Sequence, residues 1–383
     1  MKRVKEKKVR HKRKKRAIFL VVEVLILSVL SVVAYGMMKM DKINVQDIQT
    51  NVTNKNLNLD DYTNVALFGL DARIGETDGV RSDTIIVASI DNKNKKINLI
   101  SVFRDTFLQQ KDGTYDKANS AYAYGGAQEA VDMLNKNLDL DIEDYASVNF
   151  KALADVVDLL GGIEIELTLE EIGHLNNYSV ETSEVTGLSY TPLPAEAGNY
   201  NLSGVQAVSY ARIRYTDGGD FKRAERQRIV LEKIMQGLKK AGILKLNKII
   251  DKVLPEVTTS LDMKQMLQMA EYLIEYDMGS TTGFPFENQT PDYISGYSGS
   301  YVVPVNLQAN VEELHATLFA GKEYEPSETL VQISNEIIYM TGIDKAYEDP
   351  AVAEPADTDS AYTDQGYEEP GYQEPVYEEP QYE

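Results

Sequence analysis

Apolar residues in the first half of the chain gather in short runs that are typical of buried strands. The runs TNVALFGLD at 63–71, TIIVASI at 84–90 and INLISVF at 97–103 follow one another at close spacing. A later run, IEIEL at 163–167, predicts another strand. Each run is short and is followed by polar or glycine-containing residues, as expected for strands that end in turns.

Other segments have the spacing of amphipathic helices. Leu153, Val156, Val157 and Leu160 are three or four residues apart, and Gly161-Gly162 closes this helix. Further helices are predicted at 119–138 and around 231–238, 266–274 and 311–318. Residues 168–200 are polar and rich in Ser and Thr, so this segment is predicted to be a long surface excursion.

The alternation of strands and helices predicts an α/β fold. We expect a mixed central sheet covered by helices on both faces, an α-β-α sandwich. Open sheets of this kind bind ligands at the carboxyl ends of their strands. Asp71, Asp83 and Arg104 all fall at predicted strand ends, so the ligand site is expected among them.

A long apolar run near the N-terminus predicts one transmembrane helix ahead of this fold. Residues 17–38 contain one charge, Glu23, and as a helix they would extend about 33 Å, enough to cross a bilayer. The first 16 residues hold 11 Lys and Arg, so the N-terminus is expected in the cytoplasm. A cleaved signal peptide is the alternative, but its apolar core would be unusually long. We expect a single-pass cell-membrane protein whose remaining chain is extracellular.

Five segments follow from these patterns. They are a basic cytoplasmic tail at 1–16, a membrane span at 17–38, a polar stalk at 39–61, a globular body at 62–325 and an acidic tail at 344–383. In the last segment Tyr recurs every five residues from Tyr362 to Tyr382, with Pro in phase, which predicts disorder. This tail could contact the cell wall or a partner, or serve only as a solvated spacer.

Composition excludes several kinds of chemistry. The net charge is -21 and the basic residues concentrate at the N-terminus, which argues against nonspecific nucleic-acid binding. The absence of cysteine excludes disulfides, thiolate nucleophiles and cysteine-ligated zinc. Only three histidines are present, and nothing around them suggests a Ser-His-Asp arrangement.

The segment GLDARIGETDGVRSDT at 69–84 contains the first candidate site. Asp71 ends one predicted strand and Asp83 begins the next, so adjacent strands would bring both carboxylates to one edge. Paired carboxylates with open positions suit Mg²⁺ (or Mn²⁺), which also takes phosphate oxygens as ligands. The alternative is that Asp71 ends a strand and Asp83 caps a turn. The same segment contains Arg73 and Arg81.

A second cluster, SVFRDT, places Arg104 and Asp105 at the end of a strand, and Lys117 and Asn119 follow shortly after. This pair could be a simple ion pair at a strand end. The third cluster is richer in arginine and occupies 211–228. Guanidinium groups bind phosphate through two parallel hydrogen bonds and remain charged.

In the third cluster, Arg212 and Arg214 share one face if the backbone is extended there. Arg223, Arg226 and Gln227 lie just inside the next helix, on neighbouring positions of one face. A solvated helix face with ion pairs to Glu225 would also explain the helical arginines. Taken together, two carboxylates and at least four arginines indicate a pyrophosphate site.

These clusters, in this order and behind one N-terminal anchor, resemble the LytR-CpsA-Psr family. The matching segments lie between residues 62 and 241 and include GLDAR, VRSDTIIVASID, INLISVFRDT and LSGVQAVSYARIRYTDGGDFKRAERQR. Phe103 departs from the family, because many members have Pro there, and the Tyr/Glu/Pro tail lies outside the family pattern. The resemblance makes 62–325 a catalytic domain.

The resemblance implies a phosphotransferase at the outer face of a Gram-positive-type cell membrane, which moves a teichoic acid or capsule glycopolymer from a polyprenyl pyrophosphate carrier to peptidoglycan. It implies that Asp71 and Asp83 hold the metal. The implied pyrophosphate ligands are Arg73, Arg81, Arg104, Lys117, Arg212, Arg214, Arg223, Arg226 and Gln227. Asp220 is a candidate general base, or alternatively the N-cap of the following helix. The lipid groove of the family cannot be distinguished from ordinary core in the sequence.

Three other functions remain open at this point. Water could replace the sugar hydroxyl, which would make the protein a polyprenyl pyrophosphate phosphatase. A non-catalytic regulator or attenuator is a second possibility, although 16 cytoplasmic residues are too few for a DNA-reading fold. The third is a passive wall-binding module, which would not need Asp71, Asp83 or Arg104.

Overall fold

The computed structural model describes residues 44–50, 57–70 and 79–345. Within these residues the central element is a mixed sheet of seven strands. Across the sheet the order is β1 (Asn44–Val45), β10 (Val257–Thr259), β7 (Asp144–Asn149), β2 (Tyr62–Leu70), β3 (Ser82–Asp91), β4 (Lys96–Val102) and β11 (Asp277–Phe284). Strands β2, β3 and β4 are antiparallel neighbours, whereas β7 runs parallel to β2 and β11 parallel to β4. The predicted mixed α/β sheet is confirmed.

The three central strands bury side chains on both faces, which explains their continuous apolar runs. In β3, Ile85 and Val87 belong to the core on one face, while Ile86 and Ala88 belong to a second core on the other. Successive side chains of a strand point to opposite faces, so a strand covered on both sides needs apolar residues at nearly every position.

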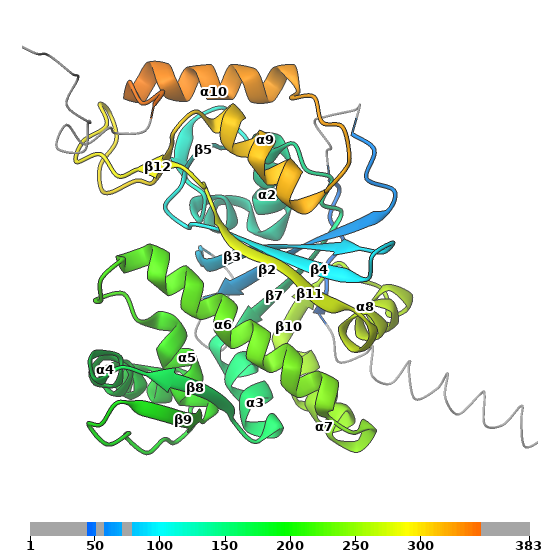
Figure 1. Cartoon of the computed structure of the whole chain (residues 1–383), viewed down its shortest axis with the longest axis vertical. Coiled ribbons are helices and arrows are strands. Elements are labelled where there is room, and N and C mark those ends of the chain that lie inside the picture. The colour runs from blue at the N-terminus through cyan, green and yellow to red at the C-terminus, as the bar shows by residue number, and fades with distance from the viewer. Residues whose placement is uncertain (1–43, 51–56, 71–78, 346–383) are drawn as a thin grey trace, which may run out of the picture. The chain divides into compact units, whose positions relative to one another are not determined.

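The upper face in Figure 1 is covered by three helices. They are α2 (Ser120–Leu138), α9 (Leu307–Leu318) and α10 (Glu328–Thr341), and they pack on the largest core cluster together with Phe68 and Ile100 of the sheet. Helix α2 is interrupted by non-helical backbone at Gly125 and Gly126, of which Gly126 has a φ of 66°. Two short hairpins border this layer, β5–β6 (Phe107–Gln109 and Tyr115–Lys117) and β12–β13 (Asn288–Gln289 and Val303–Pro304).

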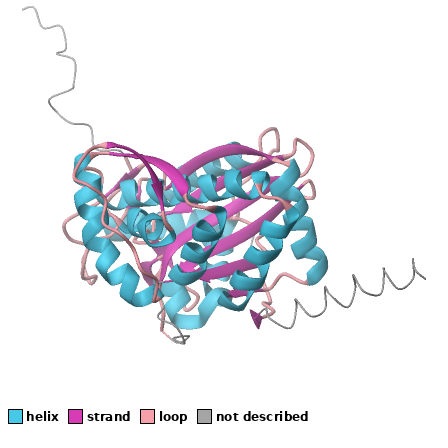
Figure 2. Ribbon diagram, turned by 90° about the horizontal axis from the view of Figure 1, so that it is seen from below, coloured by secondary structure: helices cyan, strands magenta, loops and turns pink. Residues whose placement is uncertain are grey.

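Helices also cover the lower face, so the predicted α-β-α arrangement is confirmed for the described residues (Figure 1). The view from below shows helices lying across the strands (Figure 2). These helices are α3 (Phe150–Leu160), α5 (Gly204–Arg212), α6 (Gly219–Lys240), α7 (Ile243–Val253) and α8 (Met263–Glu275), with a short 3-10 turn, η1 (Leu254–Glu256). A separate core forms between α3, α5, α6 and the hairpin of β8 (Ile163–Leu167) with β9 (Gly198–Leu202).

The prediction of a surface excursion at 168–200 is wrong. This segment contains the helix α4 (Leu169–Thr186), which begins with a capping box between Thr168 and Glu171. The buried face of α4 carries Ser179, Thr182 and Thr186 beside two apolar residues. Their hydroxyl groups donate to carbonyl oxygens one turn earlier, Ser179 to Leu175 and Thr186 to Thr182. Small polar residues on the buried face hide the apolar periodicity.

The globular body extends beyond both predicted boundaries of 62 and 325. Leu59 is buried against the main core, and β1, within the predicted stalk, pairs with β10. At the other end, Leu330, Ile333 and Ile337 of α10 are fully buried in the same core. Their spacing of three and four residues is that of a helix with one apolar face.

The predicted cytoplasmic tail and membrane span, residues 1–38, lie outside the described residues, as does the acidic tail after Lys345. None of the helices described between residues 44 and 345 is both long and apolar enough to cross a membrane.

Candidate active site

Three strand ends meet at one edge of the sheet. Because β3 is antiparallel to β2 and β4, the start of β3 lies beside the ends of its two neighbours. Asp83 is the second residue of β3, and Arg104 lies two residues beyond β4. Nη1 of Arg104 donates to Oδ1 of Asp83 at 2.7 Å. The expected meeting of Asp83 and Arg104 is confirmed, whereas Asp71 and Arg73 lie outside the described residues.

The loop between α5 and α6 brings a second arginine to the same carboxylate. Nη2 of Arg214 donates to Oδ2 of Asp83 at 3.1 Å. The condition under which Arg212 and Arg214 would share one face, an extended backbone, is not met, because Arg212 is the last residue of α5 and Ile213 is its C-cap. Both arginines nevertheless line the same cavity.

Helix α4 holds the side chain of Arg212 in place. Its guanidinium donates to Oγ1 of Thr182 and to Oε2 of Glu181, both at 2.9 Å. The same group lies over the ring of Phe150, 4.8 Å from its centroid, and 5.6 Å from that of Tyr178. Stacking on aromatic faces fixes the plane of a guanidinium. The apolar pattern of the sequence does not predict these supports, although the capping box between Thr168 and Glu171 is a signal for the start of α4.

Asp220 lies in the first turn of α6 and contacts three arginines. Its Oδ2 accepts from Nη2 of Arg223 at 2.7 Å and lies 3.6 Å from Nε of Arg104, and its Oδ1 lies 4.0 Å from Nε of Arg214. The alternative that Asp220 is the N-cap is wrong, because Gly218, with a φ of 85°, occupies that position. The carboxylates of Asp83 and Asp220 and the guanidinium groups of three arginines thus form one cluster in which opposite charges are neighbours.

These contacts set the charge state of the site. Burial alone would raise the pKa of Asp83, but the neighbouring Arg104, Arg223 and Arg214 reverse this effect and hold the pKa below its ordinary value. Burial lowers the pKa of Arg223 to about 10, with Arg104 and Arg214 adding to the effect and Asp220 opposing it. The Asp83 carboxylate therefore remains ionised, as a metal ligand must be.

Arg223 has unused donors in a buried position. Its exposed fraction is 3%, and its Nε and Nη1 have no hydrogen-bond partner among residues 44–50, 57–70 and 79–345. A buried cation with unpaired donors is destabilising unless an anion compensates it. This side chain lines the cavity, so its free donors mark a site for an anionic ligand.

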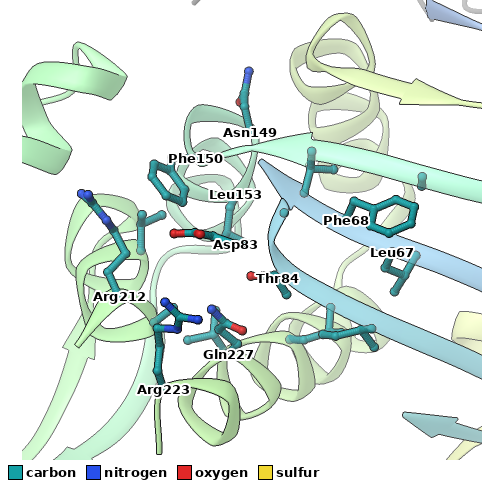
Figure 3. A pocket seen from close by; sticks show the side chains of 18 of the residues that line it. Leu67, Phe68, Asp83, Thr84, Asn149, Phe150, Leu153, Arg212, Arg223 and Gln227 are labelled. Carbon is teal, nitrogen blue, oxygen red and sulfur yellow. The ribbon is translucent and has the colours of Figure 1, made fainter. Parts of the chain in front are cut away.

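The cavity beneath the sheet is apolar for most of its length and charged at one end. Its volume is about 430 Å³, within the range of small-molecule sites. The apolar lining comes from the strands and from α3, α5 and α6, and consists of Leu67, Phe68, Ile86, Ala146, Val148, Phe150, Leu153, Val208, Ala211, Val230 and Leu231. Figure 3 shows Asp83, Arg212, Arg223 and Gln227 together on one side, away from Leu67 on the strands.

The remaining predicted ligands lie in different surroundings. Gln227 lines the cavity with Arg223, one helical turn away. Nζ of Lys117 pairs with Oδ1 of Asp105 at 2.8 Å, next to Arg104. Arg81 is exposed, just before β3.

Arg226 is an exception among the predicted pyrophosphate ligands. It is 2% exposed, and it is not one of the described residues that line the cavity. Nε and Nη2 both approach Oε1 of Glu171 at 3.0 Å, Nη1 donates to the carbonyl oxygen of Ile213 and Nη2 to Oγ1 of Thr216. Because its donors are used within the protein, the expectation that Arg226 binds pyrophosphate is not supported. It supports the loop that carries Arg214 instead.

The residues at the charged end fit a divalent cation only if the substrate supplies further ligands. In the part of the chain that the structure describes, no group of three or more His, Cys, Asp or Glu is placed to hold a metal. Asp83 is the carboxylate in the described cavity lining. Mg²⁺ commonly takes one or two carboxylates and completes its shell with phosphate oxygens and water, which this donor set allows.

Comparison with known proteins identifies the family. The model of the LytR_cpsA_psr family matches residues 30–313. The chain belongs to this family.

The family includes relatives with named activities. The chain is 35% identical to a polyisoprenyl-teichoic acid–peptidoglycan teichoic acid transferase, TagU, from Enterococcus faecalis, over 56% of this chain and 67% of the relative. A TagU from Halalkalibacterium halodurans is 34% identical over 55% of this chain and 64% of its own length. The chain thus spans about two thirds of these relatives. A solved structure, TagT bound to LI-WTA, is 22% identical and has a TM-score of 0.56 over 72% of this chain and 99% of that one, which shows a shared fold.

Proposed function

We propose that this protein is a phosphotransferase that moves a glycopolymer of the teichoic acid or capsule type from a polyprenyl pyrophosphate carrier to peptidoglycan. The observation that carries the proposal is Arg223, a buried guanidinium with two free donors at the charged end of an apolar cavity. A pyrophosphate fits the charged end and an isoprenoid chain fits the rest. The related TagU proteins are named as transferases of this kind.

The lipid half of the substrate accounts for the cavity. An isoprenoid chain is entirely apolar, and its transfer from water to such a cavity contributes about 25 cal/mol per Å² of buried surface. A soluble nucleotide would not use a lining of Leu, Val, Ile and Phe side chains. The cavity ends at Arg212, Arg214 and Arg223, so a lipid seated in it has its pyrophosphate among the guanidiniums.

The reaction is a phosphoryl-group displacement. A sugar hydroxyl of the acceptor attacks the polymer-side phosphorus, a new P–O bond forms, and the bond to the bridging oxygen breaks. Polyprenyl phosphate leaves with the electron pair, and the hydroxyl proton passes to solvent or to a nearby base. Arg104, Arg214 and Arg223 stabilise the charge that develops on the phosphate oxygens. Such reactions depend mainly on positioning and charge neutralisation, so the site needs no histidine or cysteine.

Asp220 takes a positioning role in this scheme. Because it contacts Arg104, Arg214 and Arg223, it keeps three like-charged groups together while the pyrophosphate is absent. A carboxylate that is occupied by guanidiniums is poorly placed to accept the hydroxyl proton.

We further propose that Asp83, together with Asp71, holds Mg²⁺ (or Mn²⁺) at this site. The metal would neutralise part of the pyrophosphate charge. The low pKa of Asp83 supports this role, because its carboxylate remains charged throughout the physiological pH range.

The proposed location is the outer face of the cell membrane. Residues 17–38 would anchor the chain, and the basic residues before them would stay in the cytoplasm. Both substrates, a membrane lipid and the cell wall, are within reach of a domain tethered in this way.

A transfer assay tests the proposal. The full-length chain in phospholipid vesicles is incubated with polyprenyl pyrophosphate-linked polymer, labelled in the polymer, with and without peptidoglycan. We expect label to become joined to peptidoglycan and polyprenyl phosphate to be released in equal amounts. Release of polymer phosphate at the same rate without an acceptor would instead establish a phosphatase, and no turnover would contradict both enzymes.

A further inference from the structure

A line of polar side chains continues from the charged end of the cavity toward helix α2. Asp105 links the two regions, because its Oδ2 accepts from Nε of Arg104 at 3.3 Å and its Oδ1 from Nζ of Lys117 at 2.8 Å. Neither contact involves the apolar cavity. The arginine cluster of the site therefore has the cavity on one side, and on the other side Asp105 links it to Lys117.

Beyond Lys117 the line reaches two tyrosines and a second aspartate. Nζ of Lys117 lies 5.2 Å from the ring centroid of Tyr301, whose hydroxyl donates to Oδ1 of Asp116 at 3.4 Å. The hydroxyl of Tyr124 donates to Oδ2 of Asp116 at 2.6 Å. We call Asp105, Lys117, Tyr301, Asp116 and Tyr124 the outer strip.

The outer strip and the cavity belong to opposite layers of the fold. Tyr301 and the residues around Lys117 pack with α2 on the upper core, whereas the cavity is lined by α3, α5 and α6 below the sheet. Figure 1 shows α2 above the sheet and these three helices below it. The cavity reaches the sheet edge at Asp83, and the outer strip reaches it through Arg104, which pairs with Asp83. This edge therefore separates a lipid side from an outer side.

The in-line geometry of the phosphoryl-transfer reaction predicts which substrate binds on the outer side. In phosphoryl transfer the attacking and leaving oxygens lie roughly in line on opposite sides of the phosphorus. With the isoprenoid chain in the cavity, the leaving polyprenyl phosphate is on the lower side. The attacking hydroxyl must then approach from the upper side, where the outer strip lies.

The chemistry of the strip suits a carbohydrate. Tyr124 is 62% exposed, although its hydroxyl is fixed by Asp116. A fixed and exposed aromatic face offers apolar contact at low entropic cost, and sugar rings present C–H faces that pack on it. By contrast, Tyr301 is 5% exposed and belongs to the main core cluster, so it offers little surface to a ligand.

We infer that the outer strip is the binding site for the sugar residues of the peptidoglycan acceptor, with Tyr124 as the contact surface and Asp116 as the residue that orients its ring. This inference rests on the proposed function, because it uses the direction of attack in that reaction. It assigns the acceptor to a surface that is separate from the lipid cavity and adjoins the pyrophosphate site at Arg104.

Transfer kinetics of the full-length chain in vesicles test the inference. For Tyr124→Ala we expect the KM for soluble peptidoglycan fragments to rise about tenfold, since one aromatic contact is lost. The KM for the lipid-linked donor should stay unchanged. Tyr124→Phe keeps the ring and should retain most of the acceptor affinity. Tyr339→Ala removes another exposed tyrosine, on α10, and should change neither constant.

A direct binding measurement separates this inference from the proposed function. Calorimetry with the same peptidoglycan fragments, without donor, should show binding that is weakened in Tyr124→Ala. If the wild type binds the fragments through Tyr124 but does not transfer, the proposed reaction is wrong and the glycan site stands. A rise in donor KM would assign the strip to the donor polymer, and unchanged acceptor binding would also overturn the inference.

Discussion

Arg214 and Asp83 are 131 residues apart in the sequence, yet Nη2 of the arginine and Oδ2 of the aspartate are 3.1 Å apart in the fold. Asp83 belongs to the central sheet and Arg214 to the loop between two helices of the lower layer. Their contact therefore joins the two layers that enclose the cavity. The site exists only when these layers are packed together, and its residues can be tested separately.

Asp83→Asn removes a charge but preserves the shape of the side chain. Three guanidiniums then face each other with one counter-charge fewer, so we expect inorganic pyrophosphate to bind as tightly as before or more tightly. We expect kcat for transfer to fall by about 100-fold, because the carboxylate that orients Arg104 and Arg214 and would hold the metal is lost.

Calorimetric titration with pyrophosphate and a steady-state transfer assay measure the two effects. Asp277→Asn is a suitable control, because the Asp277 side chain is 91% exposed and far less constrained. An Asp83→Asn enzyme with full kcat would remove Asp83 from the proposed mechanism.

Arg223→Met tests the buried guanidinium. Hydrogen bonds to a charged group contribute about 1.5–3 kcal/mol each, so pyrophosphate affinity should fall at least tenfold. The free energy of unfolding should stay the same or rise by about 1 kcal/mol, because a buried, incompletely paired cation is removed and its partner Asp220 keeps Arg104 and Arg214 as neighbours. Pyrophosphate calorimetry and urea unfolding in detergent measure these changes.

Arg228→Met is the matched control on the same helix. Nη1 of Arg228 likewise lacks a hydrogen-bond partner within the described part of the chain, and burial lowers the pKa of this guanidinium. Arg228 is not among the described residues that line the cavity. Its removal should leave pyrophosphate affinity unchanged. Equal losses in both variants would mean that Arg223 acts through the helix rather than through the ligand.

The sequence predicted the strands and the charged residues at their ends. It did not predict which residues line the cavity or which contacts hold Arg212 and Arg226 in place. Ile85 to Ile90 is recognisable as a buried strand because nearly all its residues are apolar, and strand ends then place Asp83 beside Arg104. Val208 and Val230 line the cavity, yet they are the same residue types that fill the core, so composition cannot separate the two. The pairing of Arg226 with Glu171, 55 residues away, required α4, whose buried hydroxyl residues concealed it.

Ala211→Phe tests whether the cavity takes a lipid. Ala211 lines the cavity from α5 and is 7% exposed, so a phenyl ring there would occupy space that an isoprenoid needs. We expect the KM for a long-chain polyprenyl pyrophosphate donor to rise about tenfold, while the affinity for inorganic pyrophosphate stays unchanged. Val180→Phe, at an exposed position of α4, is the control. A loss of pyrophosphate affinity in Ala211→Phe would indicate a distorted site instead.

Arg226 and Glu171 form a buried ion pair that supports the loop of Arg214. Arg226→Met leaves the Glu171 carboxylate buried without its partner, which should lower the free energy of unfolding by about 3–5 kcal/mol. The double variant Glu171→Gln/Arg226→Met should lose less than the sum of the two single variants, because no unpaired charge remains. Urea unfolding of the two single variants and the double variant gives the coupling free energy between the two residues. Additive losses would show that the ion pair does not contribute to stability. In the double variant kcat should still fall, since the loop that carries Arg214 loses the hydrogen bonds that Arg226 donates to Ile213 and Thr216.

His315 should make the stability of the fold dependent on pH. It is 3% exposed, Nε2 donates to the carbonyl oxygen of Leu138 at 3.0 Å, and the ring stacks on Tyr324 with centroids 3.7 Å apart. Burial lowers the pKa of this imidazole from 6.5 to about 4. Between these values the unfolded chain binds a proton that the folded chain does not, so stability must fall as the pH decreases from 6.5 toward 4.

The lost stability from this one group approaches about 3 kcal/mol at the lower end of that range. His315→Gln retains a donor for Leu138 but cannot take up the proton. Urea midpoints measured at pH 7 and pH 5 should therefore differ less in His315→Gln than in the wild type, whatever the variant's absolute stability. His174→Gln, on α4, serves as the comparison for a histidine outside the main core. An identical pH dependence in His315→Gln and the wild type would show that the buried ring does not resist protonation, and that other groups are responsible for the acid sensitivity.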